Sequence, residues 1–181
     1  MFKQIPNIIT VIRILLIAPL LYLLHLQDYS TAIWIFFVAG ASDGIDGFLA
    51  KRFDWKTRFG AILDPIADKL LLVSTLLMLS INSAISWWLF ALITARDIMI
   101  VIGAYVYHRA MGPYEMQPSR ISKANTFFQI TMVVALLISL GLIPIMPVII
   151  ESLKIIVIVT TVLSGLHYAV LWGGRYRRNK K

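Results

Sequence analysis

The sequence predicts an all-α, polytopic membrane protein with six transmembrane helices and both termini in the cytoplasm. Hydrophobic residues make up 59% of the chain, charged residues only 14%, and the mean hydropathy is +0.82. The apolar residues form long blocks without heptads or alternation, and the basic residues gather in every second connection between them. These features exclude a soluble domain, a disordered chain and a nucleic-acid-binding protein. We expect one domain over residues 1–181.

Six apolar blocks are long enough to cross a membrane, since a helix needs roughly 20 residues to span the hydrocarbon core. Polar, glycine and proline residues separate the blocks. The predicted spans are residues 8–26, 31–49, 62–80, 87–107, 121–140 and 148–172.

The first block resembles a signal peptide only superficially. Lys3 precedes it, but Arg13 interrupts the apolar run and no small-residue cleavage site follows. We therefore expect an uncleaved helix. Asn7, Thr10 and Arg13 recur every three residues and form one polar stripe, in which the charge of Arg13 needs a phosphate or carboxylate partner. Thr10 alone could simply bond its own helix backbone.

Orientation follows from the basic residues, because those near helix ends stay in the cytoplasm. They lie before the first span, between the second and third, between the fourth and fifth, and after the sixth, whereas the opposite loops contribute little beyond Lys154. The net charge of +8 is thus a property of the cytoplasmic face. The chain has no cysteine, which excludes disulfides and thiolate metal sites.

Four of the nine acidic residues fall where the second span ends and the third begins. Asp43 and Asp46 are three residues apart and Asp64 and Asp68 four apart, so each pair shares one face of its helix. Such carboxylates repel one another in a membrane unless cations neutralise them. Oxygen ligands without His or Cys favour Mg²⁺ or Mn²⁺, with Ca²⁺ as a competitor.

Two simpler interpretations remain open for this region. The small residues beside the acids could serve only close helix packing. Asp64 and Pro65 could be the N-cap and first residue of a helix, although an N-cap carboxylate can also bind metal.

The acidic residues also carry a family resemblance. Residues 43–68 resemble the D-x2-D-G-x2-A-R-x8-G-x3-D-x3-D signature of the CDP-alcohol phosphatidyltransferases, with seven of its eight fixed positions matched. The departure is Lys51, where the family has arginine: lysine keeps the positive charge but lacks the bidentate fork for phosphate.

The resemblance implies a two-metal mechanism. Asp43, Asp46 and Asp64 would hold two Mg²⁺ or Mn²⁺ ions, and Asp68 would be a metal ligand, the general base, or both. The CDP-diacylglycerol site would include residues of the signature and of a P-N-x2-T-x2-R opening found in several branches of the family. These residues are Asn7, Thr10, Arg13, Gly47, Ala50, Lys51 and Gly60.

Three cations suggest where an anionic acceptor binds: Arg96, Arg120 and Lys123. An internal Arg96–Asp97 pair is the simpler alternative, but neighbours in sequence point to different helix faces and are expected to pair poorly. The segments around Arg96-Asp97 and Ser122-Lys123 look like the cardiolipin synthase branch of the family. Phosphatidylglycerol is therefore the expected acceptor, with cardiolipin and CMP as products.

Two other functions remain as alternatives. A phosphatidylglycerophosphate synthase would use glycerol 3-phosphate as the acceptor instead. An ion or proton transporter would also carry acidic residues in its helices, but here the second half of the chain holds no matching cluster. Further expectations are a bacterial inner-membrane location, a cytoplasmic active site, contact with membrane lipids, no nucleic-acid partner and, from the resemblance, a homodimer.

Overall fold

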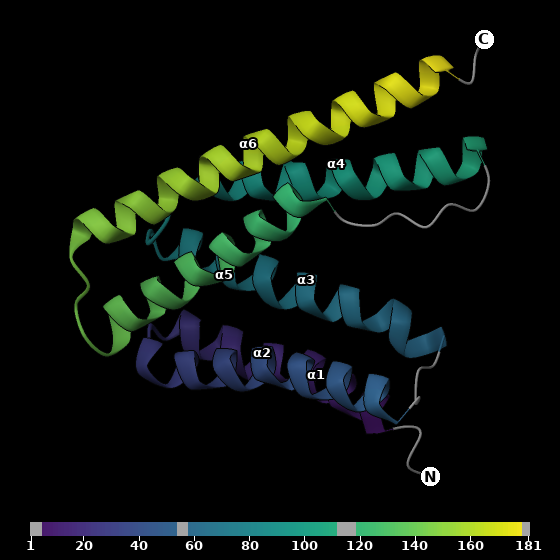
Figure 1. Cartoon of the computed structure of the whole chain (residues 1–181). Helices are drawn as coiled ribbons and strands as arrows, with labels where there is room; N and C mark the ends of the chain where they lie inside the picture. The colour runs from purple at the N-terminus through teal and green to yellow at the C-terminus, as the bar shows by residue number, and fades with distance from the viewer. Residues whose placement is uncertain (1–4, 54–57, 112–118, 179–181) are drawn as a thin grey trace. The chain divides into compact units, whose positions relative to one another are not determined.

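The computed structural model describes residues 5–53, 58–111 and 119–178, which form six α-helices and no strand (Figure 1). The helices are α1 (Ile5–His25), α2 (Tyr29–Arg52), α3 (Arg58–Ile81), α4 (Trp87–Met111), α5 (Arg120–Gly141) and α6 (Pro147–Arg178). Within these helices the side chains at 5–6, 43, 45–51, 58–59, 61–62, 106–108, 110–111 and 171–178 lie outside the description. The all-helical prediction is confirmed.

Each predicted span corresponds to one helix, and the largest difference lies at the end of α6, which reaches Arg178 instead of ending at 172. The difference that bears on the acidic residues lies at the start of α3. This helix begins at Arg58, four residues before the predicted start, so Asp64 and Pro65 lie inside it. The interpretation of Asp64 and Pro65 as a helix start is therefore wrong. Proline is tolerated inside helices of membrane proteins because neighbouring groups satisfy the backbone that it leaves unpaired.

Among the described residues, four helices are long and apolar enough to cross a membrane: α1, α4, α5 and α6. In α2 the described apolar segment is Tyr29–Ser42. The span count of six and the cytoplasmic termini stay predictions.

The described chain divides into two compact units, which we treat separately. The first contains α1, α2, α3 and the last part of α5, from Val133 onward. Within it α1 packs against both α2 and α3, and α2 also touches α3 (Figure 1). Whether both units form the single predicted domain stays a prediction.

The first unit is packed through narrow stripes on its helices. Buried residues recur at helical spacing, as in Leu20 and Leu24 of α1 and Leu72, Leu76 and Leu79 of α3. Large apolar side chains elsewhere on these helices are exposed, which is the expected pattern for helices that face lipid. The buried stripes bring the polar face of α1 toward α3.

Asp28 caps the start of α2. Its Oδ1 accepts hydrogen bonds from the Ser30 hydroxyl at 2.7 Å and from the Thr31 backbone N–H at 3.1 Å. These bonds, the Ser30 bond first, favour the ionised form and lower the pKa of Asp28 below its ordinary value. The cap fixes the turn between α1 and α2.

Gly141, the last residue of α5, lies against the first residues of α2. A Cβ placed there would come within 2.5 Å of the backbone of Tyr29 and Ser30, which is closer than real Cβ contacts. The chain therefore needs glycine at this position for the two helix ends to meet.

Replacing Gly141 by alanine is expected to destabilise the first unit by about 1–3 kcal/mol, because backbone atoms must shift to admit the methyl group. Gly40→Ala is the matched control, since a Cβ there has no neighbour within 4 Å. Thermal unfolding of the purified protein in detergent measures both. Equal melting temperatures for the Gly141 variant and the parent would contradict the close approach.

The second unit contains α4, α6 and the first part of α5, up to Met132. α4 and α6 pack along each other (Figure 1). The buried face of α6 turns polar along its length, from Val157 to Thr161 and Ser164, and includes Tyr168. A run of buried polar groups inside apolar helices needs hydrogen-bond partners, and most of these lie on α4 and α5.

Candidate functional site

Thr10 joins α1 to the acidic face of α3. Its hydroxyl donates a hydrogen bond of 2.6 Å to Oδ1 of Asp64, and the Thr10 side chain is wholly buried. The alternative that Thr10 serves only its own helix backbone is therefore wrong.

Arg13, one turn further along α1, links three helices through one guanidinium. Its Nη1 lies 2.7 Å from Oδ1 of Asp68 on α3, and its Nε donates to Oγ of Ser42 on α2 at 3.2 Å. Arg13 is fully buried, while 47% of the Asp68 side chain is exposed. The prediction that Arg13 pairs with an anion is confirmed, and the anion is a carboxylate of the acidic signature.

Ser42 connects this pair to the other half of the signature. Its hydroxyl accepts from Arg13 and donates to the Ala39 carbonyl at 2.7 Å. Ser42 directly precedes Asp43, and α2 continues as helix to Arg52. Ser42, at the start of the Asp43–Asp46 segment, and Asp68 thus bond the same guanidinium.

Other predicted residues are described only in part. Asn7 is half-buried on α1, and Gly60 is buried near the start of α3. The remaining signature positions lie in the helical part of α2, but their side chains are outside the described residues: Asp43, Asp46, Gly47, Ala50 and Lys51. Their roles stay predictions.

The donor set on α3 suits a hard divalent cation. Asp64 and Asp68 offer carboxylate oxygens one helical turn apart. Each carboxylate also accepts a hydrogen bond from α1, as is usual for carboxylates that ligate metals. Among the described residues no three acidic or histidine side chains form a cluster. A complete metal site would therefore need Asp43 and Asp46.

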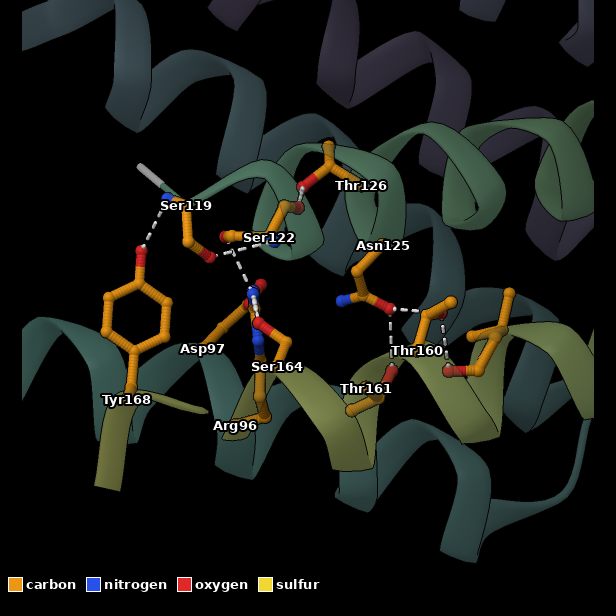
Figure 2. A network of polar contacts seen from close by, with 11 residues as sticks. Arg96, Asp97, Ser119, Ser122, Asn125, Thr126, Thr160, Thr161, Ser164 and Tyr168 are labelled. Carbon is orange, nitrogen blue, oxygen red and sulfur yellow. Dashed lines mark hydrogen bonds and ion pairs between the residues drawn. The ribbon is translucent and has the colours of Figure 1, made fainter. Parts of the chain in front are cut away.

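The second unit contains a separate buried polar network centred on Arg96 of α4 (Figure 2). Its Nη1 lies 2.7 Å from Oδ1 of Asp97, and its Nη2 donates to Oγ of Ser122 on α5 at 2.7 Å and to Oγ of Ser164 on α6. Arg96 and Asp97 are 6% and 8% exposed. The guanidinium therefore ties α4, α5 and α6 together.

The expectation that Arg96 and Asp97 pair poorly is wrong. Their Cβ atoms do leave the helix in different directions, but the long arginine side chain curves back so that its end reaches the neighbouring carboxylate. Burial favours this geometry, because each charge needs a close counter-charge in the apolar interior.

The other two cations predicted for the acceptor stand at the start of α5. Arg120 and Lys123 are exposed, and Ser122 lies between them. Ser119 caps this helix: its Oγ accepts from the Ser122 N–H at 3.1 Å, while its own N–H donates to the Tyr168 hydroxyl (Figure 2). The first turn of α5 is thus held from both α4 and α6.

Sequence reasoning missed several polar partners. Ser42 and Ser164 resembled ordinary small residues of packed helices. Asn125 accepts from the hydroxyls of Thr160 and Thr161, each at 2.9 Å (Figure 2). Ser122 and Asn125 fell within a segment that resembled one branch of the family, which is the signal that could have revealed them.

Comparison with known proteins extends over nearly the whole chain. Residues 3–167 match the family described as CDP-alcohol phosphatidyltransferase. The cardiolipin synthase (CMP-forming) / mitochondrial hydrolase fusion protein of Schizosaccharomyces pombe is 34% identical, over 91% of this chain and 30% of that protein. Cardiolipin synthase (CMP-forming) of Rattus norvegicus is 32% identical, over 72% of this chain and 49% of that protein.

A relative with a different name matches a shorter segment. The CDP-diacylglycerol--glycerol-3-phosphate 3-phosphatidyltransferase of Pseudomonas fluorescens is 42% identical, over 54% of this chain and 52% of that protein. The matches thus span between 30% and 52% of the length of these three relatives.

Proposed function

This chain belongs to the CDP-alcohol phosphatidyltransferase family, and from that membership we propose that it transfers the phosphatidyl group of CDP-diacylglycerol to phosphatidylglycerol. Cardiolipin and CMP are the products. The observation that carries the proposal is the acidic signature, whose α3 carboxylates Asp64 and Asp68 are held by buried partners on α1. The family match supports a phosphatidyltransferase over the transporter alternative.

The proposed reaction depends on Mg²⁺ or Mn²⁺. Asp43, Asp46 and Asp64 hold two ions, with Asp68 as a further ligand or as the base. When bound, the ions offset the charge of the diphosphate and stabilise the CMP leaving group. The hydrogen bond from Thr10 to Asp64 and the all-oxygen donor set on α3 support this assignment.

The chain's own residues bind the two substrates and move one proton. The acceptor hydroxyl attacks the phosphorus that bears the diacylglycerol, and the bond from this phosphorus to the oxygen of CMP breaks. Asp68 takes the hydroxyl proton, a role that its 47% exposed side chain permits. Lys51 contacts the donor phosphate as a point charge, and Asn7, Gly47, Ala50 and Gly60 line the nucleotide site.

The acceptor is assigned to the first turn of α5. Arg120 and Lys123 are exposed there and can meet a lipid phosphate at headgroup depth. Arg96 is buried and acts through Ser122, which its guanidinium holds between these two cations. The names of the S. pombe and R. norvegicus relatives favour phosphatidylglycerol as the acceptor.

Glycerol 3-phosphate is the second candidate acceptor. The P. fluorescens relative, named for this acceptor, has the higher identity of the three, although over a shorter segment. Both acceptors are anionic, so the exposed cations of α5 suit either. The reaction chemistry and the aspartate roles are the same in both cases.

An acceptor competition distinguishes the two enzymes. Purified protein receives labelled CDP-diacylglycerol, Mg²⁺, phosphatidylglycerol and glycerol 3-phosphate at equal availability in mixed micelles. We expect labelled cardiolipin, read by thin-layer chromatography, and no product when Mg²⁺ is chelated. Phosphatidylglycerophosphate as the sole product would promote the second candidate, and turnover without a divalent ion would reject the metal assignment.

We also propose a bacterial inner-membrane location, an active site that faces the cytoplasm, and a homodimer. The basic connections support the orientation. The family resemblance supports the dimer, and native mass spectrometry of the detergent-solubilised protein tests it.

A further inference from the structure

We propose that α1 supplies the outer shell of the metal site: Thr10 and Arg13 are positioning residues for Asp64 and Asp68. The resemblance implied that Thr10 and Arg13 bind CDP-diacylglycerol. In the role proposed here they contact the carboxylates and not this substrate. The inference rests on the proposed function, because it takes the α3 carboxylates as metal ligands.

Burial is the first argument for this role. Thr10 and Arg13 are both completely buried, whereas 47% of the Asp68 side chain is exposed. A substrate that approaches from the exposed side therefore meets the carboxylate and not the groups behind it. Thr10 and Arg13 are thus more deeply buried than Asp64 and Asp68.

Geometry is the second argument. The three-residue step from Thr10 to Arg13 on α1 matches the four-residue step from Asp64 to Asp68 on α3. Thr10 and Arg13 therefore each meet one α3 carboxylate. In both pairs the donor lies at hydrogen-bond distance from Oδ1, at 2.6 Å for Thr10 and 2.7 Å for Arg13. Bonds of this kind fix the rotamer of a ligating carboxylate before the ion arrives.

The two carboxylates receive different kinds of partner. Thr10 offers a neutral hydroxyl, which orients Asp64 and leaves its negative charge intact for a cation. Arg13 offers a guanidinium, which offsets the charge of Asp68. The α1 partner of Asp68 therefore carries a charge, and the α1 partner of Asp64 does not.

Arg13 also sets the spacing between two segments of the signature. Because the same guanidinium bonds Ser42 and Asp68, it holds the residue before Asp43 at a fixed distance from the end of the motif. A lysine has one nitrogen at the end of its chain and cannot reproduce the planar fork. Arg13→Lys therefore keeps the positive charge and removes the bonding geometry of the guanidinium.

Thr10→Val provides the main test, because it removes the hydroxyl and keeps the shape. Mn²⁺ affinity of the purified protein is measured from the electron paramagnetic resonance signal of free Mn²⁺, without substrate. We expect Thr10→Val to weaken Mn²⁺ binding by about ten- to hundredfold, the usual effect of losing an outer-shell partner. Thr10→Ser restores the hydroxyl and is expected to bind Mn²⁺ nearly as the parent does.

Thr131→Val is the matched control, since the Thr131 hydroxyl bonds the Phe127 carbonyl of its own helix. Its Mn²⁺ affinity is expected to equal that of the parent. At saturating Mn²⁺ the KM of Thr10→Val for CDP-diacylglycerol is expected to stay at the parent value. An unchanged Mn²⁺ affinity together with a raised KM would overturn the inference and return Thr10 to the lipid-nucleotide site.

Arg13→Lys decides the matter if Thr10→Val does not fold. We expect it to weaken Mn²⁺ binding and lower kcat while the KM for CDP-diacylglycerol is unchanged; the reverse pattern overturns the inference. Asp64→Asn distinguishes failure of this inference from failure of the proposed function. If this variant loses Mn²⁺ binding while neither α1 variant does, the inference alone fails; if the parent binds no Mn²⁺, the proposed function fails with it.

Discussion

Replacing Asp64 by asparagine is expected to abolish phosphatidyl transfer while the protein still inserts and folds. Asparagine keeps the size of the side chain and can accept the Thr10 hydrogen bond, but it lacks the charge that holds a divalent ion. Loss of several kcal/mol of charge stabilisation corresponds to a fall in kcat of roughly a thousandfold or more. Asp43→Asn and Asp46→Asn are expected to behave in the same way.

The assay is release of CMP at saturating Mg²⁺, with helix content and melting temperature measured on the same samples. Glu151→Gln is the matched control: Glu151 is an exposed carboxylate near the start of α6, paired with Lys154 at 2.8 Å. It should retain full turnover. Near-normal turnover in any two of the three aspartate variants would rule out the two-metal assignment.

Arg96→Met is expected to produce the largest loss of stability in the second unit. It removes a buried guanidinium and leaves the Asp97 charge without this counter-ion, a change that typically costs about 3–5 kcal/mol. The bonds from Arg96 to Ser122 and Ser164 are lost as well, so α5 and α6 lose their shared link to α4.

A double variant tests whether the pair is the cause. Arg96→Met combined with Asp97→Leu removes both charges, and replacing a whole buried pair by apolar residues is often neutral. We expect most of the lost thermal stability to return. Arg109→Met serves as the control for loss of an exposed arginine in the same helix. A single Arg96 variant as stable as the parent would show that the pair has no structural role.

Much of the fold was predictable because long apolar blocks in a sequence indicate membrane helices. The start of α3 was not predictable, because Arg58 and Gly60 belong to a charged, glycine-containing stretch that is typical of a loop. Proline at position 65 also suggested a helix start. In a membrane protein that residue can lie inside a helix, so its usual meaning did not apply.

The acidic signature was readable from spacing alone, whereas its partners were not. The sequence indicated that Arg13 needs an anion, but Asp68 is 55 residues away and only the packing of α1 on α3 brings them together. The prediction that Arg96 and Asp97 pair poorly was wrong although the two residues are neighbours in sequence. Rules for helix faces describe Cβ directions, and they do not limit where the end of a long arginine side chain lies.

The two buried arginines differ in when their charges are neutralised during biosynthesis. Asp97 follows Arg96 immediately, so α4 can enter the bilayer with its ion pair already formed. Asp68, the carboxylate paired with Arg13, is synthesised only with α3, although an arginine at the centre of a membrane helix costs about 2.5–3.5 kcal/mol. α1 has the most apolar window of the four spanning candidates, which offsets this cost at insertion. Docking of α3 onto α1 is therefore the assembly step that brings Arg13 to Asp68 and Thr10 to Asp64.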